Sequence, residues 1–219
     1  MLITYHGHSM FKLKGKRGTV VTDPFGDYIG FNMPRVSGDI VTVSHQHSDH
    51  NAHDKISGTA RRKNPFIIDQ PGEYEVGGIS VFGTKTYHDS AEGAERGENI
   101  AFTILIDGMR VCHLGDLGHE LTSKQLEEIG SVDVLLVPVG GTFTIGPELA
   151  VKTIRTLEPS IAIPMHYKTP DHDEKIFGDV KSLEEFTKEY GLEPKPEAKL
   201  DLTRSRLGEE TELVVLRAT

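Results

Sequence analysis

The run HQHSDH at residues 45–50 is the stretch of this sequence that is best suited to chemistry. It offers imidazole nitrogens and a carboxylate oxygen, which are ligands that a divalent metal such as zinc takes in proteins. The β-branched segment 39–44 predicts a buried strand directly before the run, and α/β folds carry their sites at such strand ends. The alternative is a polar, histidine-rich loop that binds no metal. The four candidate ligands are His45, His47, Asp49 and His50.

Three later residues that could ligate a metal also follow predicted strands. Strand ends on one side of a sandwich converge in space even when they are far apart in sequence, so we expect these residues to meet the HQHSDH run. Seven nitrogen and oxygen ligands exceed what one tetrahedral zinc uses, which indicates two metals that share a bridging carboxylate. The three residues are His88 after segment 79–87, Asp116 after segment 109–114, and His166 after segment 160–165.

These motifs resemble those of the metallo-β-lactamase superfamily, whose first ligand motif corresponds to HQHSDH. More narrowly, the chain is similar to the short branch of ascorbate-6-phosphate lactonase-like, Zn-dependent hydrolases. The resemblance covers nearly the whole chain and implies a four-layer αβ/βα sandwich with two similar halves, as a single domain over residues 1–219. The shared motifs are Tyr-His-Gly-His-Ser, Thr-Asp-Pro-Phe, His-Leu-Gly-Asp and Ile-Pro-Met-His-Tyr-Lys.

The same resemblance implies how the ligands divide between two divalent metal ions, with Zn²⁺ expected and Mn²⁺ or iron as alternatives. The ligands of the first ion would be His45, His47 and His88. The ligands of the second ion would be Asp49, His50 and His166, and Asp116 would bridge both ions. Many relatives continue the His-x-Gly-Asp motif with threonine, whereas Leu117 follows here, so one hydroxyl contact beside the site is missing.

A site of this kind predicts a hydrolase that uses a metal-bridging hydroxide on a small phosphodiester, lactone or ester. Two cations about 3.5–4 Å apart lower the pKa of a bridging water and polarise the scissile group. Asp49 or Asp116 would accept the proton, and His119 would protonate the leaving group. The alternatives are an iron-dependent redox enzyme on the same scaffold and a domain that binds metal or a small ligand without catalysis.

Other polar residues near the predicted site have two interpretations each. Asp23 either accepts a hydrogen bond from a ligand histidine or is an ordinary turn residue before a proline. His6 and His8 either face the pocket or pack elsewhere, and their roles stay open. His113 alternates away from its neighbours along a strand, which favours a hydrogen-bonded core histidine. Lys168 either binds an anionic group of the substrate or is a surface lysine, and the second interpretation is favoured.

Composition narrows the class of protein. The 219 residues are 37% hydrophobic and 26% charged, which provides ample material for a core. A net charge of −9 disfavours binding to nucleic acid or anionic lipid, and the basic cluster 61–63 is best explained as a solvated turn. We therefore expect a small-molecule substrate and neither a nucleic-acid nor a membrane partner, and the sequence leaves a homo-oligomer open.

Cysteine content and hydropathy bear on the compartment. Cys112 is the only cysteine, so an intrachain disulfide is excluded and a reducing compartment is favoured. The first residues carry no charged segment followed by an apolar one, and no apolar run approaches the ~18 residues of a membrane span. These features predict a cytoplasmic protein.

Hydrophobic periodicity predicts strands in both halves and helices in the second. Thr122 with Gln125 and Ser182 with Glu185 have the pattern of capping boxes at helix starts. Similar apolar strands in the two halves suggest two sheets face to face with helices outside, a four-layer α/β sandwich. The loops 26–38, 89–98 and 167–180 are expected to shape the pocket. The expected helices are 123–129, 147–157 and 183–190, and the expected strands include 39–44, 79–87, 100–106, 109–114, 132–139 and 160–165.

Overall fold

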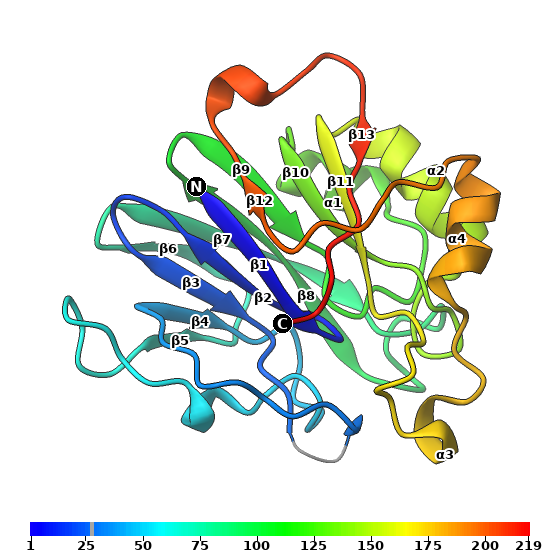
Figure 1. Ribbon diagram of the computed structural model, residues 1–219, viewed down its shortest axis with the longest axis horizontal. Coiled ribbons are helices and arrows are strands. Elements are labelled where there is room, and N and C mark those ends of the chain that lie inside the picture. The colour runs from blue at the N-terminus through cyan, green and yellow to red at the C-terminus, as the bar shows by residue number, and fades with distance from the viewer. Residues whose placement is uncertain (27–28) are drawn as a thin grey trace.

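The computed structural model describes residues 1–26 and 29–219, which fold into two β-sheets packed face to face (Figure 1). The first sheet has the order β12-β1-β2-β3-β4-β5, and the second has the order β13-β11-β10-β9-β8-β7-β6. The strands of the first sheet are β1 (Leu2–Gly7), β2 (Met10–Lys14), β3 (Thr19–Thr22), β4 (Ile40–Thr42), β5 (Phe66–Ile68) and β12 (Leu200–Asp201). The strands of the second sheet are β6 (Gly72–Val76), β7 (Ile79–Tyr87), β8 (Glu98–Ile106), β9 (Met109–His113), β10 (Val134–Pro138), β11 (Ile161–Met165) and β13 (Glu212–Leu213).

The two sheets share one topology. In the first, the antiparallel strands β1, β2 and β3 lead into the parallel strands β4 and β5. In the second, the antiparallel strands β6 to β9 lead into the parallel strands β10 and β11. Both parallel segments begin with a wholly buried strand, β4 or β10. The expected α/β sandwich with two similar halves is confirmed.

Helices cover the second sheet, with α1 against β7 and β8 and α2 against β10 (Figure 1). The three expected helices are present as α1 (Ser123–Ile129), α2 (Pro147–Leu157) and α4 (Leu183–Tyr190). Both predicted capping boxes form, because the side chains of Thr122 and Ser182 accept from the backbone N–H of residues 125 and 185. A short helix that the periodicity did not indicate, α3 (Glu174–Phe177), is capped by the Asp173 side chain.

Within the described residues, the outer face of the first sheet is covered by loops, the 3₁₀ turn η2 (His53–Lys55) and Phe177 of the short helix α3. The connection from β4 to β5 therefore differs from the expectation of helices outside both sheets. Its residues are too polar to form an amphipathic helix, so apolar loop side chains supply the cover instead. These side chains are Phe25, Ile29, Phe31, Val36 and Ile56, and they pack with Val21, Val41 and Val43 of the sheet.

The main hydrophobic core lies between the sheets and ties them together beside the site. Tyr5 and Phe11 of the first sheet stack with ring centres 4.7 Å apart, and both are buried. Phe11 also contacts the ring of His113 in β9, at 6.2 Å between centres. The carboxyl ends of β4, β7, β9 and β11 all lead directly into candidate ligands, so packing of the two sheets brings these ends together. No helix in residues 1–26 and 29–219 is long and apolar enough to cross a membrane.

Candidate metal centre

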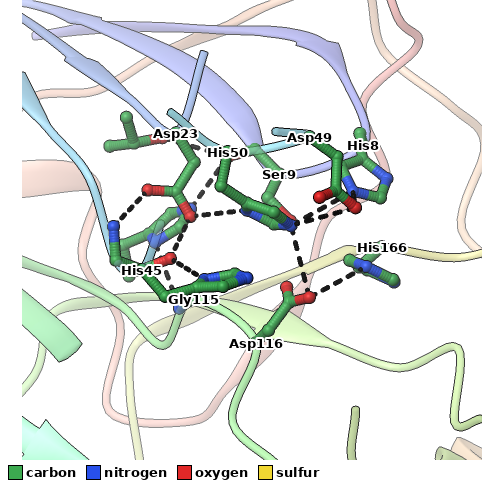
Figure 2. A network of polar contacts seen from close by, with 12 residues as sticks. His8, Ser9, Asp23, His45, Asp49, His50, Gly115, Asp116 and His166 are labelled. Carbon is green, nitrogen blue, oxygen red and sulfur yellow. Dashed lines mark hydrogen bonds and ion pairs between the residues drawn. The ribbon is translucent and has the colours of Figure 1, made fainter. Parts of the chain in front are cut away.

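The Asp116 carboxylate contacts three imidazoles, of which Figure 2 labels those of His50 and His166. Its Oδ2 lies 3.2 Å from His50 Nε2 and 3.3 Å from His88 Nε2. The same oxygen lies 3.2 Å from His166 Nε2. Because these residues follow β9, β4, β7 and β11, one carboxylate joins the ends of four strands from two sheets. A carboxylate that bridges two cations would occupy such a position.

Among the described residues, the side chains around Asp116 form two groups, and Asp23 with His45 and His50 forms a third that overlaps both; within each group the ligand atoms lie within 4.8 Å of one another. The structure thus brings together the residues named from the sequence and separates them into the two expected sets. One residue, His8, joins a set without having been assigned to it. The first group is His45, His47 and His88, and the second is His8, Asp49, His50 and His166.

The buried polar atoms of the cluster fit a divalent cation. His45 Nε2, His88 Nδ1 and Asp116 Oδ1 are buried without a hydrogen-bond partner, as are both ring nitrogens of His166. The contact between His166 Nε2 and Asp116 Oδ2 is short, but its direction is not that of a hydrogen bond. Each unpaired buried group destabilises a protein by roughly 1–3 kcal/mol, and a bound cation would provide the missing partner. Imidazole and carboxylate donors suit zinc, manganese or iron.

Asp23 determines which nitrogen of two cluster histidines faces the centre. Its Oδ2 accepts a hydrogen bond of 2.9 Å from His50 Nδ1 and another from the Ser44 hydroxyl. Since that hydroxyl donates to Asp23, its oxygen accepts from His45 Nδ1, 2.9 Å away. Both rings therefore carry a proton on Nδ1, which leaves Nε2 as the nitrogen that faces the centre and can bind a metal. Asp23 thus accepts a hydrogen bond from a candidate ligand histidine, as one of its two interpretations predicted.

Charge and burial set the protonation of these groups. Burial would raise the pKa of Asp23, but the nearby His113 and His50 rings and the hydrogen bond from His50 hold that pKa below its usual value. Burial lowers the pKa of His45 and of His47, so both rings are neutral near pH 7. Burial also disfavours a charged His50, yet the carboxylates of Asp116 and Asp49 raise its pKa well above the ordinary value. A metal at His50 must therefore displace a proton.

The position of Asp116 depends on Gly115 and Asn99. Asn99 Oδ1 accepts a hydrogen bond of 2.9 Å from the Asp116 N–H, and its Nδ2 donates to Leu114 O at 2.9 Å. Gly115 has φ +55°, and a Cβ there would lie 2.4 Å from Asn99 Oδ1 and 2.5 Å from the Cβ of Ser44. Only glycine fits this close approach of the two strand ends. A lone asparagine within a strand offers no sequence signal, so Asn99 was missed.

His8 reaches the second group from the turn between β1 and β2, and hydrogen bonds determine its tautomer. The backbone N–H of Thr169 donates to His172 Nδ1 at 3.1 Å, so the proton of that ring is on Nε2. His172 Nε2 then donates to His8 Nδ1 at 3.3 Å, which leaves the His8 proton on Nε2. That N–H faces Asp49 Oδ2 at 3.3 Å and His50 Nε2 at 3.2 Å. His8 thus orients two residues of the second group, whereas His6 contacts the Thr219 carbonyl instead.

The remaining polar candidates lie outside the cluster. His113 accepts from the Gly115 N–H at 3.1 Å and donates to Ser9 O at 2.8 Å, which confirms a hydrogen-bonded core histidine. Lys168 binds the Glu174 carboxylate and the Gly178 carbonyl, both at 2.9 Å, as a surface lysine does. Leu117 is fully buried in the core.

His119 does not join the cluster that the described residues form. Its Nε2 accepts a hydrogen bond of 3.1 Å from the Tyr87 N–H, and its Nδ1 donates to Glu120 O at 2.8 Å. Both ring nitrogens are thus bound to the main chain, because the ring packs beside the end of β7. This arrangement leaves no nitrogen for a leaving group, so the proton donor expected at His119 has no support in the structure.

A cleft of about 500 Å³ opens onto the cluster. Candidate ligand side chains line it together with two phenylalanines and an isoleucine. A second hollow of about 320 Å³ adjoins it and shares Gln46, His47 and Arg96 with it. The cleft is lined by Gln46, His47, Ser48, Asp49, His88, Arg96, Asp116, Phe143, Ile176 and Phe177.

Fold, ligand pattern and family comparison agree. Residues 2–166 match the family model of the β-lactamase superfamily domain, and the chain belongs to the metallo-β-lactamase superfamily. A UPF0173 metal-dependent hydrolase of Thermoplasma volcanium is 32% identical over 91% of this chain and 98% of its own. One of Korarchaeum cryptofilum is 35% identical over 76% of this chain and 83% of its own.

A solved structure supports the same family assignment. It is that of a proposed Zn-dependent hydrolase of the metallo-β-lactamase superfamily from Thermotoga maritima, with a TM-score of 0.79 and 41% identity over 98% of this chain and 97% of that one. The chain is thereby classed with the metal-dependent hydrolases of this superfamily, which confirms the family resemblance found in its motifs. The narrower likeness to ascorbate-6-phosphate lactonase-like proteins stays a prediction.

Proposed function

We propose that this protein is a dinuclear metal-dependent hydrolase that acts on a small ester, lactone or phosphodiester. The observation that carries the proposal is the Asp116 carboxylate, which lies within 3.3 Å of imidazoles from three strand ends, between two groups of ligand atoms. A single ion would leave one of these groups unpaired in a buried site. When bound, two divalent cations lower the pKa of water and polarise a carbonyl or phosphoryl oxygen.

The candidate ligands and the proton acceptor would have separate roles, set by their positions in the cluster. His45, His47 and His88 would hold one ion, and Asp49, His50 and His166 the other, with Asp116 shared. Asp49 lines the open cleft and is ionised, since the positive charge of His50 and the hydrogen bond from His8 outweigh burial and keep its pKa low. It is therefore placed to accept a proton from the attacking water. Asp116, beneath it, is the second acceptor.

Elemental analysis of the purified protein tests the number of ions. We expect close to two equivalents of zinc or manganese, and loss of both metal and turnover in the double variant His45→Ala, His47→Ala. His53→Ala is the matched control, because His53 lies in the same loop but outside the cluster. Full metal retention in the double variant would overturn the assignment.

A hydrolysis panel tests the reaction. It should include bis-aryl phosphodiesters, phosphorylated lactones and simple aryl esters, each measured with the metal-loaded protein and after chelation. Turnover of one class that is lost on chelation and restored by the metal supports a hydrolase. A protein with bound iron that consumes oxygen, or one that binds two ions and hydrolyses none of these, would instead support the redox or the non-catalytic alternative.

A further inference from the structure

Arg96 lies in the wall of the metal-site cleft without an ionic partner among the residues that the structure describes. Its half-buried guanidinium stacks on the Phe143 ring, 5.0 Å from the ring centre. Of the carboxylates close to it in sequence, Glu98 pairs with Lys85, and Asp89 binds main-chain N–H groups. Arg96 lines a cleft that has room for an acceptor of its N–H groups.

The loop that carries Arg96 is held rigidly next to a candidate metal ligand. The Asp89 carboxylate accepts four hydrogen bonds, from the N–H groups of residues 91, 93, 95 and 96. The Gly97 carbonyl accepts a hydrogen bond from the His88 N–H at 3.1 Å, which ties the far end of the loop to the candidate ligand at the end of β7. A preorganised arginine loses little conformational entropy when an anion binds. The position of Arg96 relative to the cluster is thus built into the fold.

The side of the cleft next to Arg96 is apolar. Phe143 and Phe177 meet edge to face with ring centres 5.9 Å apart, and Ile176 is 41% exposed. An exposed isoleucine beside two aromatic rings favours a hydrocarbon or aromatic part of a ligand. The cleft thus offers candidate metal ligands, apolar side chains and an arginine that has no ionic partner among the described residues.

We propose that Arg96, stacked on Phe143, forms an anion-binding subsite for the substrate. The substrate would carry, apart from its scissile bond, a negatively charged phosphate, sulfate or carboxylate group on an apolar scaffold. This inference rests on the proposed hydrolase function, because the same cleft holds the candidate metal ligands. Arginine suits this role because its planar fork pairs with such oxygens in a bidentate manner.

Calorimetric titration with two matched probes tests the subsite in the protein as purified. Naphthalene-2-sulfonate is an apolar anion whose sulfonate is a weak metal ligand, and naphthalene-2-methanol is its uncharged counterpart. We expect the wild type to bind the sulfonate at least roughly tenfold more tightly than the alcohol, as one charge-assisted contact allows. Arg96→Gln should lose that preference, and Arg96→Lys should keep part of it. Metal content should stay at the wild-type level in both variants.

Arg62→Gln is the matched control, because Arg62 also stacks on a phenylalanine, 6.0 Å from the Phe66 ring, but outside the cleft. It should bind both probes as the wild type does. Equal sulfonate affinity in wild type and Arg96→Gln, or an equal loss in Arg62→Gln, would overturn the subsite. Hydrolysis without any preference for the sulfonate would overturn the subsite alone. Arg96-dependent sulfonate binding in a protein that hydrolyses no ester would overturn only the hydrolase.

Discussion

At the scale of single residues, the site depends on hydrogen bonds that choose tautomers. Asp23 and Ser44 together place the protons of His45 and His50 on Nδ1. The chain from Thr169 through His172 places the proton of His8 on Nε2. The first arrangement leaves Nε2 of both rings for a metal, and the second yields a donor for Asp49. The histidines of the cluster therefore differ in role because their hydrogen-bond partners differ.

Replacing Asp23 by asparagine should weaken metal binding. An asparagine amide cannot provide the negative charge that holds the His50 proton on Nδ1, and its NH₂ group competes for the same contacts. We expect metal affinity to fall by roughly 10–100-fold, the usual effect of losing such a partner. Competition with a chromophoric chelator measures it. Asp54→Asn, an exposed aspartate in η2, is the control, and equal affinity in Asp23→Asn and wild type would refute the role.

The lone thiol should be inert while the protein is folded. Cys112 is fully buried, and burial raises its pKa from 9.0 to about 12. Because the thiol keeps its proton to a higher pH in the folded chain than in the unfolded one, its contribution to stability is fully present below pH 9. That contribution is lost as the pH rises from 9 through about 12. We expect no reaction with a disulfide reagent at pH 8, and one thiol per chain after unfolding in guanidinium. Rapid labelling of the native protein would contradict this burial.

At the scale of elements, the loop between β7 and β8 acts as a preformed unit. A single carboxylate, Asp89, replaces the hydrogen bonds that a sheet or helix would give its N–H groups. Because this loop joins His88, which follows β7, to the strand that carries Asn99, it also connects two parts of the candidate metal centre. Its conformation therefore matters to both the ligands and Arg96.

Acid should loosen this loop through Asp89. Burial would raise the pKa of its carboxyl, but the four N–H donors outweigh burial and hold the pKa at about 2, below the ordinary 3.8. A depressed pKa contributes stability that is fully present above pH 3.8 and is lost as pH falls through about 2. Hydrogen exchange of the amides at 91–96, relative to those of β8, should therefore quicken over this range.

Asp89→Asn should remove that pH dependence. The variant should exchange quickly at pH 5 already, since an amide offers only one acceptor oxygen to the loop. Asp54→Asn should behave as the wild type does. Protection that is the same in Asp89→Asn and wild type at pH 5 would show that the carboxylate does not organise the loop.

At the scale of the whole molecule, the cluster joins the two sheets. His45 and His50 follow β4 of the first sheet, whereas His88, Asp116 and His166 follow strands of the second. Ion binding would therefore add a link across the sandwich at the edge where the strands end. The core between the sheets supplies the remaining cohesion.

Removing the metal should lower thermal stability. An ion at a thousand times its Kd stabilises the folded state by roughly 4 kcal/mol, and a chain of this size shifts its Tm by about 2–4 °C per kcal/mol. We therefore expect Tm to fall on the order of 10 °C with excess EDTA, and to recover with added Zn²⁺. Scanning calorimetry measures both steps. An unchanged Tm in protein shown to be metal-free would mean that the cluster binds no stabilising ion.

Local patterns in the sequence determined most of the secondary structure and the candidate ligands. The capping boxes at Thr122 and Ser182 and the apolar run of β10 depend on neighbours a few residues away, so they can be predicted without the fold. The HQHSDH run is equally local. His88, Asp116 and His166 were accessible because strand ends meet at one edge of a sandwich.

Only the tertiary structure decided which other residues reach the centre. His8 and His172 are 164 positions apart, and their contact depends on how the loop after β11 folds over the first sheet. The stacking of Arg96 on Phe143 likewise joins two loops of different strands. His119 lies close to Asp116 in sequence, yet main-chain hydrogen bonds direct its ring elsewhere. Such contacts arise from the packing of distant segments, which periodicity and spacing along the chain do not encode.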